Sequence, residues 1–490
     1  MTTTEVTPSQ RYRDSFPTPV EDFAIEGIDV LDVPLHSAVL PPTPAHPGGS
    51  GLGYGATREE ARTGAMGEMA EMALSLCAHQ GVSREQGSYA ELTRRHGRDR
   101  VADPRELCLE AGGEYSDDRV LQWLPMTRLR DGESVLVPAE LVASGPEDLP
   151  GAPPPDGWLT TVITNGQGAA FDVRAATVHA LLELLQRDGN ATAFRAMDRG
   201  VVVDLSGLTD PTSLDLLARA RAHGVEPVVK LASTGFGMTD VYVVGCSVDA
   251  SEPVPVMVTA CGEAAHPDVE VAVRKALLEW AAARTRKAFM HGPLDVVRSA
   301  TPPDYLDRWL TGHPPERLVE EDRALEAMLD WSRRSGPELV ELLSGTVLSR
   351  RRAVPLADLP TCTPDDVHDH VVEALAAGGH EVLVSVHPSE DGEVVAVKAV
   401  VPGLEVETMS YGRIGERGVE RLREQGSGLV SVGDRPDGPG WAAVALTDDA
   451  CERLGGPAWF DLVARDRVVG ALYPLYREPG RHVVAALASA

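Results

Sequence analysis

Positive charge is scarce in this chain of 490 residues, which carries 45 lysines and arginines against 74 aspartates and glutamates. The net charge of −29 leaves no basic face for general binding of DNA or RNA. Long apolar runs are also missing. No stretch approaches the roughly 20 residues that cross a bilayer, and the N-terminal residues lack the apolar core of a signal peptide. We therefore expect a cytoplasmic protein with no nucleic-acid partner and no membrane association.

Cysteines and the common catalytic motifs are equally sparse. The six cysteines are scattered and form no C-x-x-C pair, which argues against a disulfide scaffold and against the usual zinc spacing. The sequence contains no G-x-x-x-x-G-K-[ST], no G-x-S-x-G and no H-E-x-x-H. A glycine run at Gly51, Gly53 and Gly55 lacks the spacing of a dinucleotide-binding turn. Any nucleotide chemistry must therefore use a site without a P-loop.

The pattern of apolar residues predicts an α+β fold. The chain is longer than one ordinary domain needs, so we expect a large two-lobed domain or two domains. Long helices are expected from Thr57, after the polar turn at Thr164, and over His266–Met290. Several runs are typical of strands, which we expect to form mixed or antiparallel sheets. These runs are Phe23–Val33, Val135–Val142, Val201–Leu205, Glu226–Leu231, Val241–Ser247, Pro255–Cys261, Glu381–Val386 and Glu393–Val400.

The first long helix carries two carboxylates in apolar surroundings. Thr57 fits an N-cap, with Glu60 three residues on as in a capping box. Glu68 and Glu71 follow as i, i+3 neighbours among small and apolar residues. One interpretation is a partly exposed acidic face. The other is a divalent-cation site, because paired hard oxygen ligands suit Mg²⁺.

The other two long helices also carry charge among apolar residues. Glu183, Gln186 and Arg187 stand at i, i+3 and i+4, which places them on one face of a leucine-rich helix. Glu279 and Arg284 lie among alanines and leucines in the third helix. The simpler interpretation is a surface ion pair in one helix and two solvated charges in the other. Burial of such charges, in contrast, is costly unless they hold something.

Taken together, the three helices predict one site. Carboxylates from several helices can hold Mg²⁺, and arginine side chains can clamp phosphate oxygens. This combination amounts to an ATP–Mg²⁺ site that needs no P-loop. A metabolic enzyme with an unrelated acidic metal site is an alternative.

Three segments resemble, in order and at family-like separations, the signature blocks of the YcaO family. They read GYGATREEARTGAMGEMAEM, TNGQGAAFDVRAATVHALLELLQRDG and AAHPDVEVAVRKALLEWAAARTR. The resemblance runs from about Phe23 to about Gly415 and implies an α+β YcaO-like fold with ATP held between helices and sheets. It also implies a reaction on a backbone amide of a ribosomally made precursor peptide. A nucleophile adds to the amide carbon, and the amide oxygen is phosphorylated by ATP and leaves. A side-chain nucleophile gives an azoline, sulfide gives a thioamide and an amine gives an amidine.

The resemblance also assigns roles to individual residues. The expected contacts with ATP and Mg²⁺ are Glu68, Glu71, Asn165, Glu183, Gln186, Arg187, Glu279 and Arg284. Those expected to hold the metal are Glu68, Glu71, Glu183 and Gln186. Arg187 and Arg284 would neutralise phosphate charge as the phosphoryl group transfers, and with Glu183 they are the expected catalytic residues.

The chain departs from the family pattern at several points. Gln186 replaces the usual second glutamate of its block, Tyr54 stands where many members have lysine, and Ala282 stands where glutamine is common. The chain ends REPGRHVVAALASA, without the P-x-P-x-P tail of most azoline-forming members. An alternative function is therefore a degenerate scaffold that binds ATP or peptide and supports a partner enzyme.

The expected domain organisation follows the resemblance. We predict a flexible N-terminal tail over residues 1–20, a YcaO-like catalytic domain over 21–415, and a C-terminal extension over 416–490 that completes the domain. The sequence has no obvious leader-peptide-binding domain, so a separate leader-binding or TfuA-like protein is the expected partner beside the precursor peptide. A homodimer is a further expectation.

Overall fold

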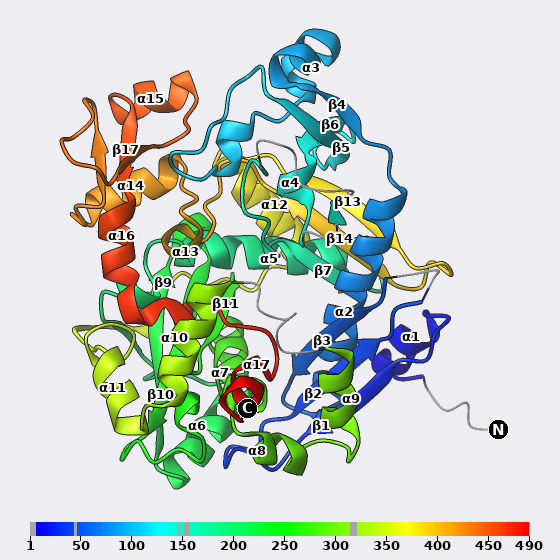
Figure 1. Cartoon of the computed structure of the whole chain (residues 1–490), viewed down its shortest axis with the longest axis vertical. Coiled ribbons are helices and arrows are strands. Elements are labelled where there is room, and N and C mark those ends of the chain that lie inside the picture. Colours follow the sequence, from blue (N-terminus) through cyan, green and yellow to red (C-terminus); the bar gives the residue numbers. More distant parts are fainter. Residues whose placement is uncertain (1–5, 44–46, 146–147, 150–156, 314–320, 490) are drawn as a thin grey trace.

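The computed structural model describes residues 6–43, 47–145, 148–149, 157–313 and 321–489. Within these residues the strands form four sheets, shown in Figure 1. Neighbouring strands are antiparallel apart from β8 and β12, which run parallel. In spatial order, the first sheet is β1 (Glu21–Ile25), β2 (Leu35–Leu40) and β3 (Gly49–Tyr54), and the fourth is β15 (Val430–Val432), β17 (Ala458–Asp461) and β16 (Trp441–Ala443). The second sheet is β11 (Gly262–His266), β10 (Thr239–Ser247), β9 (Val225–Ser233), β8 (Val201–Asp204) and β12 (Arg352–Pro355). The third sheet is β4 (Glu85–Ser88), β5 (Val120–Arg128), β13 (Leu383–Pro388), β14 (Val395–Val400) and β7 (Gln167–Ala170), with β6 (Ser134–Pro138) beside β5.

Helices cover these sheets and connect them. The longest are α2 (Arg58–Gly81), α5 (Val173–Asn190) and α7 (Val269–His291). None of the described helices is long and apolar enough to cross a membrane. The shorter helices are α1 (Pro8–Asp14), α3 (Tyr89–His96), α4 (Ala139–Val142), α6 (Pro211–Ala222), α8 (Leu294–Ser299), α9 (Tyr305–Gly312), α10 (Asp322–Ser332), α11 (Gly336–Ser344), α12 (Val367–Ala377), α13 (Thr408–Tyr411), α14 (Glu416–Glu424), α15 (Asp448–Leu454), α16 (Leu462–Val469) and α17 (Val483–Ser489).

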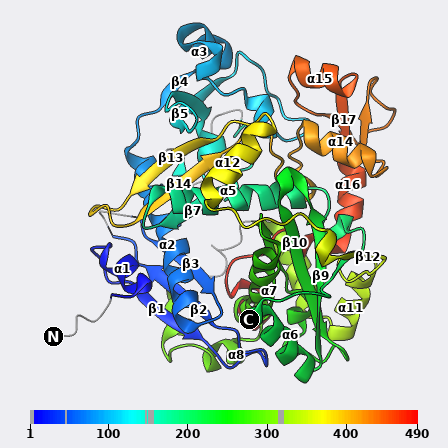
Figure 2. The same ribbon diagram turned by 180° about the vertical axis from the view of Figure 1, so that it is seen from behind.

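The three long helices share one local arrangement. Each packs on the strand that precedes it in the sequence, α2 on β3, α5 on β7 and α7 on β11. Each begins at a residue whose side chain accepts a hydrogen bond from the first turn, namely Thr57, Asp172 and Asp268. Figures 1 and 2 show the three helices around the middle of the molecule. The fold therefore brings three similar strand–helix units to one place.

Glycines allow this close packing of strand on helix. A Cβ atom at Gly53 of β3 would lie 1.9 Å from the backbone nitrogen of Ala65 in α2. A Cβ atom at Gly262 of β11 would lie 2.1 Å from the backbone nitrogen of Trp280 in α7. No side chain fits at such positions, where one backbone touches another. The glycine run around Gly53 thus serves the close packing of β3 on α2.

The main hydrophobic core lies between the five-stranded sheet and α7. Val241, Val243, Trp280 and Phe289 are fully buried there. A second cluster packs α5 and α12 against β13 and β14. Burying this apolar surface supplies most of the free energy that holds the long helices in place.

Most elements expected from the sequence are present, and the α+β class is confirmed. Glu381–Val386 and Glu393–Val400 correspond to the antiparallel pair β13 and β14. The strand expected at Pro255–Cys261 is wrong, because Pro255–Thr259 forms a 3₁₀ helix. Its residues are buried against α7 and α11, so their apolar character reflects packing and not strand pairing.

A flexible tail is expected over residues 1–20, but the chain forms the helix α1 from Pro8 onward. Residues 1–5 lie outside the described part of the chain. Helix α1 packs on α2, and Tyr12 is only 4% exposed. The Tyr12 hydroxyl donates a hydrogen bond to the carbonyl of Ala169 at 2.9 Å. A buried aromatic ring with a satisfied hydroxyl fixes the segment.

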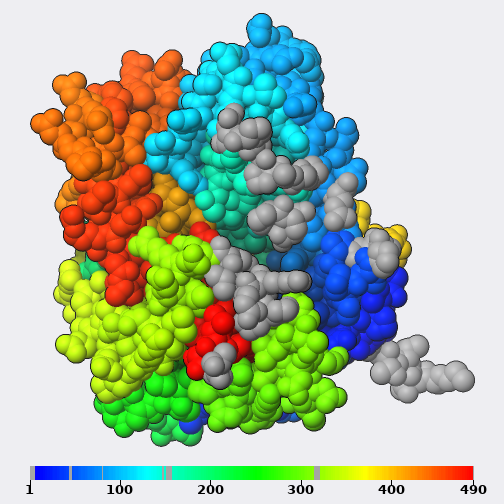
Figure 3. Space-filling view, viewed as in Figure 1, coloured from blue at the N-terminus to red at the C-terminus, as the bar shows by residue number. Residues whose placement is uncertain are grey.

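Residues after 415 form the fourth sheet and then return to the main body. Helix α17 packs against α7 and α10. In Figure 3 the C-terminal segment, in red, comes to the surface between the yellow-green residues of α10 on one side and α9 on the other. The division of the chain at residue 415 stays a prediction.

The glycine packing yields a first test. Gly53→Ala forces a methyl group onto the backbone of α2, so the strand must move away, and we expect a loss of about 3 kcal/mol or more in the free energy of unfolding. Gly81→Ala, at the end of the same helix with nothing within 4 Å of the new atom, is the control. It should be neutral or stabilising by about 0.5 kcal/mol. Urea denaturation followed by circular dichroism measures both, and equal stabilities would contradict the packing role.

Candidate active site

Three carboxylates from two helices meet at one cavity. Glu68 and Glu71 of α2 and Glu183 of α5 line a cavity of about 340 Å³, called here the acidic cavity. Each accepts hydrogen bonding from a backbone N–H of a neighbouring strand or its flanking residue, at 2.9–3.3 Å. The donors are Leu52 for Glu68, Ala169 for Glu71, and both Gly166 and Gln167 for Glu183. These bonds fix the carboxylates while leaving most of their lone pairs free.

The electrostatics of these carboxylates fit a cation site. Burial raises the pKa of the Glu71 carboxyl well above its usual value, and the nearby Glu68 and Glu183 raise it further. Burial also raises the pKa of Glu68, against the opposing effects of the Leu52 N–H and of Arg286. Like charges held this close are costly without a counter-ion. A hard divalent cation such as Mg²⁺ would relieve the repulsion, so the donor set fits this ion.

A larger cavity adjoins the acidic one. This second cavity, called here the large cavity, has a volume of about 610 Å³. It lies between β3, α7 and the segment Leu475–Arg481. Ser50 and Glu68 line both cavities, so the two adjoin at a shared wall. The volume suits a small-molecule ligand. Its cationic lining residues are Arg187, Arg195, Arg286, Lys287 and Arg481.

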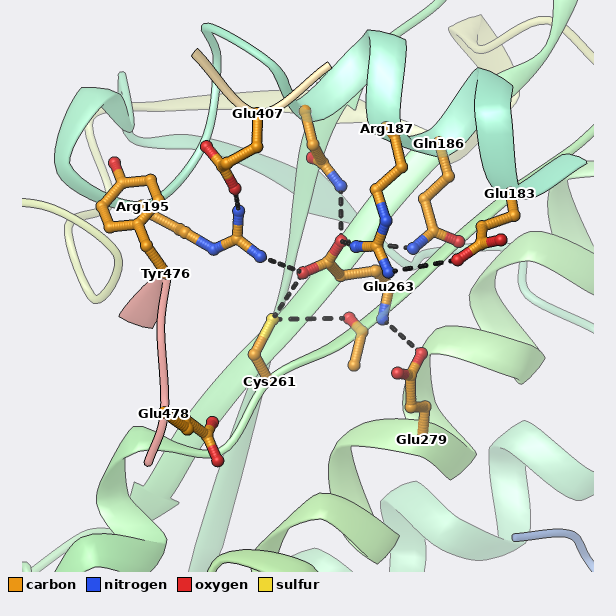
Figure 4. Close-up of polar contacts among 12 residues, drawn as sticks. Glu183, Gln186, Arg187, Arg195, Cys261, Glu263, Glu279, Glu407, Tyr476 and Glu478 are labelled. Atoms are coloured by element: carbon orange, nitrogen blue, oxygen red, sulfur yellow. Dashed lines mark hydrogen bonds and ion pairs between the residues drawn. The ribbon is translucent and has the colours of Figure 1, made fainter. Parts of the chain in front are cut away.

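Glu263 of β11 is the centre of a polar network in the large cavity, drawn in Figure 4. Its carboxylate accepts hydrogen bonds from Gln186 at 3.2 Å, Arg187 at 3.2 Å, Asn190 at 2.8 Å and Arg195 at 3.3 Å. Burial would raise the pKa of Glu263, but the guanidinium groups of Arg195 and Arg187 outweigh burial and hold the pKa below its usual value. Glu263 is therefore an ionised carboxylate whose side chain is only 9% exposed.

Glu279 of α7 lies at the wall of the large cavity. Its carboxylate accepts a hydrogen bond from the backbone N–H of Glu263 at 2.8 Å. Burial, with the nearby Glu263 charge, raises the pKa of Glu279 to about 7. Tyr54, which replaces the lysine of many family members, lines the same cavity. Burial raises the pKa of the Tyr54 hydroxyl well above its usual value, and the negative charges of Glu279 and Glu68 raise it further.

The structure corrects the expectation for Arg284. This side chain is fully buried and forms bidentate ion pairs with Asp29 and Glu252, at 2.6–3.0 Å. It does not line either cavity. The reason is helical geometry, because five residues along a helix turn the side chain about 140° away from Glu279. Arg286 and Lys287, seven and eight residues from Glu279, face the cavity instead.

Two other expected contacts are also placed elsewhere. Asn165 lines a separate small cavity with Lys398 and Arg413. The residue before it, Thr164, lines the acidic cavity. Gln186 lines neither of the two main cavities and donates its amide to Glu263. The structure thus brings Glu68, Glu71, Glu183, Arg187 and Glu279 together and leaves Asn165, Gln186 and Arg284 outside the two cavities.

The C-terminal segment supplies a wall that the sequence did not reveal. Glu478 projects into the large cavity and pairs with Lys287 and with His291, the latter at 2.8 Å. Burial raises the pKa of Glu478, but Lys287 and Arg286 outweigh it and hold the pKa well below its usual value. Tyr476 lines the same cavity and accepts a hydrogen bond from Ala196 at 3.0 Å. No P-x-P-x-P pattern marks this segment.

The placement of Arg284 and Arg286 gives a sharp contrast. Arg286→Ala should weaken the binding of Mg²⁺ and a non-hydrolysable ATP analogue by about tenfold or more and leave folding intact, because it removes one cavity cation. Arg284→Ala should destabilise the protein by about 3–5 kcal/mol, because two buried carboxylates lose their partner. Calorimetric titration and thermal melts measure the two effects. Weak binding by a well-folded Arg284→Ala protein would restore the original assignment.

Comparison with known proteins agrees with this geometry. The model of the family described as YcaO cyclodehydratase, ATP- and Mg²⁺-binding, matches residues 52–405. An uncharacterised protein of Methanothermobacter thermautotrophicus is 26% identical over 401 residues, which cover 80% of this chain and 91% of that protein.

Two solved structures share the fold. YcaO from Methanopyrus kandleri, bound with AMPPCP and Mg²⁺, is 18% identical with a TM-score of 0.54, and the match covers 83% of this chain and 91% of that one. A heterocyclase in complex with substrate and cofactor is 19% identical with a TM-score of 0.59. That match covers 86% of this chain and 55% of the heterocyclase, so this chain spans about half its length. Since the family model covers well over half of the sequence, this protein belongs to the YcaO family, and ATP and Mg²⁺ are its cofactors.

Proposed function

We propose that this protein is an enzyme that uses ATP and Mg²⁺ to modify backbone amides of a precursor peptide. One observation carries the proposal: Glu68 lines both the acidic cavity and the large cavity. A cation site and a cation-lined wall for phosphates therefore adjoin at Glu68. Family membership and the YcaO fold support the same conclusion.

The residues divide the work between the two cavities. Glu68, Glu71 and Glu183 hold Mg²⁺ through carboxylate oxygens fixed by backbone N–H groups. Arg187 and Arg286 neutralise phosphate charge from the large cavity, as the charge grows during phosphoryl transfer. ATP supplies the phosphoryl group that makes the amide oxygen of the peptide a leaving group.

Asp148 adds a fourth carboxylate to the acidic cavity. This carboxylate accepts a hydrogen bond from the N–H of Ser144 at 2.6 Å. The Nδ1 atom of His79, buried in the last turn of α2, lies 3.3 Å from the same carboxylate. Burial raises the pKa of Asp148, but these partners outweigh it and lower the pKa. The lowered pKa keeps Asp148 ionised and makes it a weak proton acceptor, so its charge would instead favour a cation in the acidic cavity.

The choice between an active enzyme and a degenerate scaffold depends on how many of the charged groups converge. Glu68, Glu71, Glu183 and Arg187 all line one or both of the two adjoining cavities, which supports an active enzyme. The nucleophile sets the product, which is an azoline for a side chain, a thioamide for sulfide and an amidine for an amine. The precursor peptide is the proposed substrate, and a leader-binding or TfuA-like partner and a homodimer stay predictions.

Co-expression with a precursor peptide from a neighbouring gene tests the function directly. Mass spectrometry should show loss of water for an azoline or a ring-closing amidine, or exchange of oxygen for sulfur for a thioamide. Glu68→Gln and Glu183→Gln should abolish the change and ATP turnover, because each removes a charged metal ligand while its helix persists. The exposed Glu326→Gln in α10 is the matched control and should keep full activity. An unmodified peptide and no ATP turnover by the wild type would favour the scaffold.

The raised pKa values predict a pH dependence of Mg²⁺ binding. Without a cation, a carboxyl whose pKa is raised by folding holds its proton more tightly in the folded state, which stabilises the fold at low pH. For Glu279, whose pKa is about 7, this contribution to stability falls as the pH rises through about 7. Mg²⁺ binding nearby favours loss of that proton, so apparent affinity for Mg²⁺ should rise about tenfold between pH 6 and pH 8. Thermal shift with Mg²⁺ alone measures this. Glu279→Gln should flatten the dependence, whereas equal affinity of the wild type at both pH values would refute it.

A further inference from the structure

Lys398 of β14 is a buried amine that the proposed function leaves unused. The residue is only 2% exposed, and its Nζ atom donates a hydrogen bond to the Ser144 hydroxyl at 3.1 Å. It forms no ion pair with any carboxylate of the described residues, whereas the buried Lys230 and Lys287 are each paired with one. An ammonium buried without a paired counter-charge is costly, so these surroundings favour loss of its proton.

Position 398 holds one of only four lysines among the 45 lysines and arginines of the chain. An arginine would keep its charge, whereas a lysine amine can give up its proton. Burial lowers the pKa of Lys398 to about 8, against the opposing effects of Glu183 and Asp148. Lys398 can therefore take up or release a proton near neutral pH. The titratable groups that act on its charge or line the same small cavity are Glu183, Asp148, Arg413, His387, Glu140 and Glu405.

Ser144 connects this amine to the acidic cavity. Ser144 lines the acidic cavity, whereas Lys398 lines the small cavity that Asn165 also lines. The backbone N–H of Ser144 donates a hydrogen bond to the Asp148 carboxylate at 2.6 Å, which fixes the residue. A hydroxyl group can accept one proton while it gives up its own. A proton that reaches Ser144 from the acidic cavity can therefore pass on to Lys398.

The acidic cavity is open on a side that does not adjoin the large cavity. Ser50 and Glu68 form the wall that the two cavities share. Met72 and His179 line the acidic cavity but not the large one, and both are exposed, His179 with 56% of its side chain. Ser144 does not line the large cavity either. A peptide can thus approach Ser144 without crossing the cavity proposed for the nucleotide.

We propose that Ser144 and Lys398 together accept the proton that the nucleophile loses when it adds to the peptide amide. The inference rests on the proposed function and assigns one step of it. The lone pair of the nucleophile forms the new bond to the amide carbon, and the carbonyl π electrons move to the oxygen that ATP then phosphorylates. The proton of the nucleophile goes to Ser144 Oγ, whose own proton moves to Lys398 Nζ and completes an ammonium ion. Ser144 touches the substrate, and Lys398 acts through Ser144.

The pH dependence of peptide modification tests the pair, at saturating Mg²⁺ and with the peptide of the co-expression test. The wild-type rate should rise about tenfold or more between pH 6 and pH 8, as Lys398 loses its proton. Lys398→Arg keeps the charge but cannot serve as a base, so the rate should fall about 100-fold and lose this rise. Lys398→Met gives the same test if arginine does not fit the buried position. Ser144→Ala should lower the rate about tenfold or more.

Two controls separate a proton acceptor from a structural role. Ser385 lies opposite Lys398 on β13 and lines neither main cavity, so Ser385→Ala should keep the wild-type rate and its pH dependence. Binding of Mg²⁺ and a non-hydrolysable ATP analogue, measured by calorimetry, should stay within about threefold of the wild type in every variant. An unchanged pH profile in Lys398→Arg and Lys398→Met, or equal losses of rate and of binding, would overturn the inference.

Carbon-13 NMR of the full-length protein labelled at lysine Cε gives a readout that needs no peptide. The four lysines give four signals, and the one that Lys398→Arg removes belongs to Lys398. Without Mg²⁺ its titration midpoint should lie at about 8, and Ser144→Ala should lower it, because the ammonium loses its hydrogen-bond acceptor. A midpoint at the usual lysine value of about 10.4 would overturn the inference. A wild type that modifies no peptide and binds no ATP analogue defeats the proposed function, while a wild type that does both with a usual Lys398 midpoint defeats this inference alone.

Discussion

Repulsion among Glu68, Glu71 and Glu183 is the constraint on which the site depends. Carboxylates that meet in a protein interior normally separate by changing rotamer or helix position. Here neither change is open, because each carboxylate is tied to a backbone N–H and each helix is packed on its strand. The raised pKa values record the remaining repulsion. The rigidity of the fold thus prepares the site for a cation before the cation arrives.

That rigidity comes from one local arrangement of strand and helix that occurs three times. In each unit a strand with a glycine touches its helix, a capping side chain starts the helix, and an acid from the helix bonds back to the strand or to its flanking residue. Glu68 bonds to β3, Glu183 to Gly166 just before β7, and Glu279 to β11. This arrangement explains why these acids lie close together, because each acid is held against its own strand and the three strand–helix units meet in one place. The sequence shows no repeat of 20–50 residues because only the cap, the glycine and the acid recur.

Much of this could be predicted from sequence because the signals are local. A cap, an apolar helix face and charged residues three or four apart all lie within about four turns of one helix, so the sequence places Glu68, Glu71 and Glu183 on their helices. Arg286 could have been found in the same way, since it stands seven residues from Glu279 and shares its face. The assignment of Arg284 followed the family spacing and not the helical period, and for this reason it reached a buried ion pair.

The parts that could not be predicted depend on contacts between distant segments. Glu263 meets Arg187 across 76 residues, and Glu478 meets Lys287 across 191. No local pattern marks either acid, because only the folded chain brings it to the cavity. Four cations of the large cavity are therefore already paired with carboxylates from elsewhere, namely Arg187, Arg195, Arg286 and Lys287. A phosphate that binds Lys287 must compete with Glu478, so nucleotide binding and the position of the C-terminal segment are thermodynamically linked.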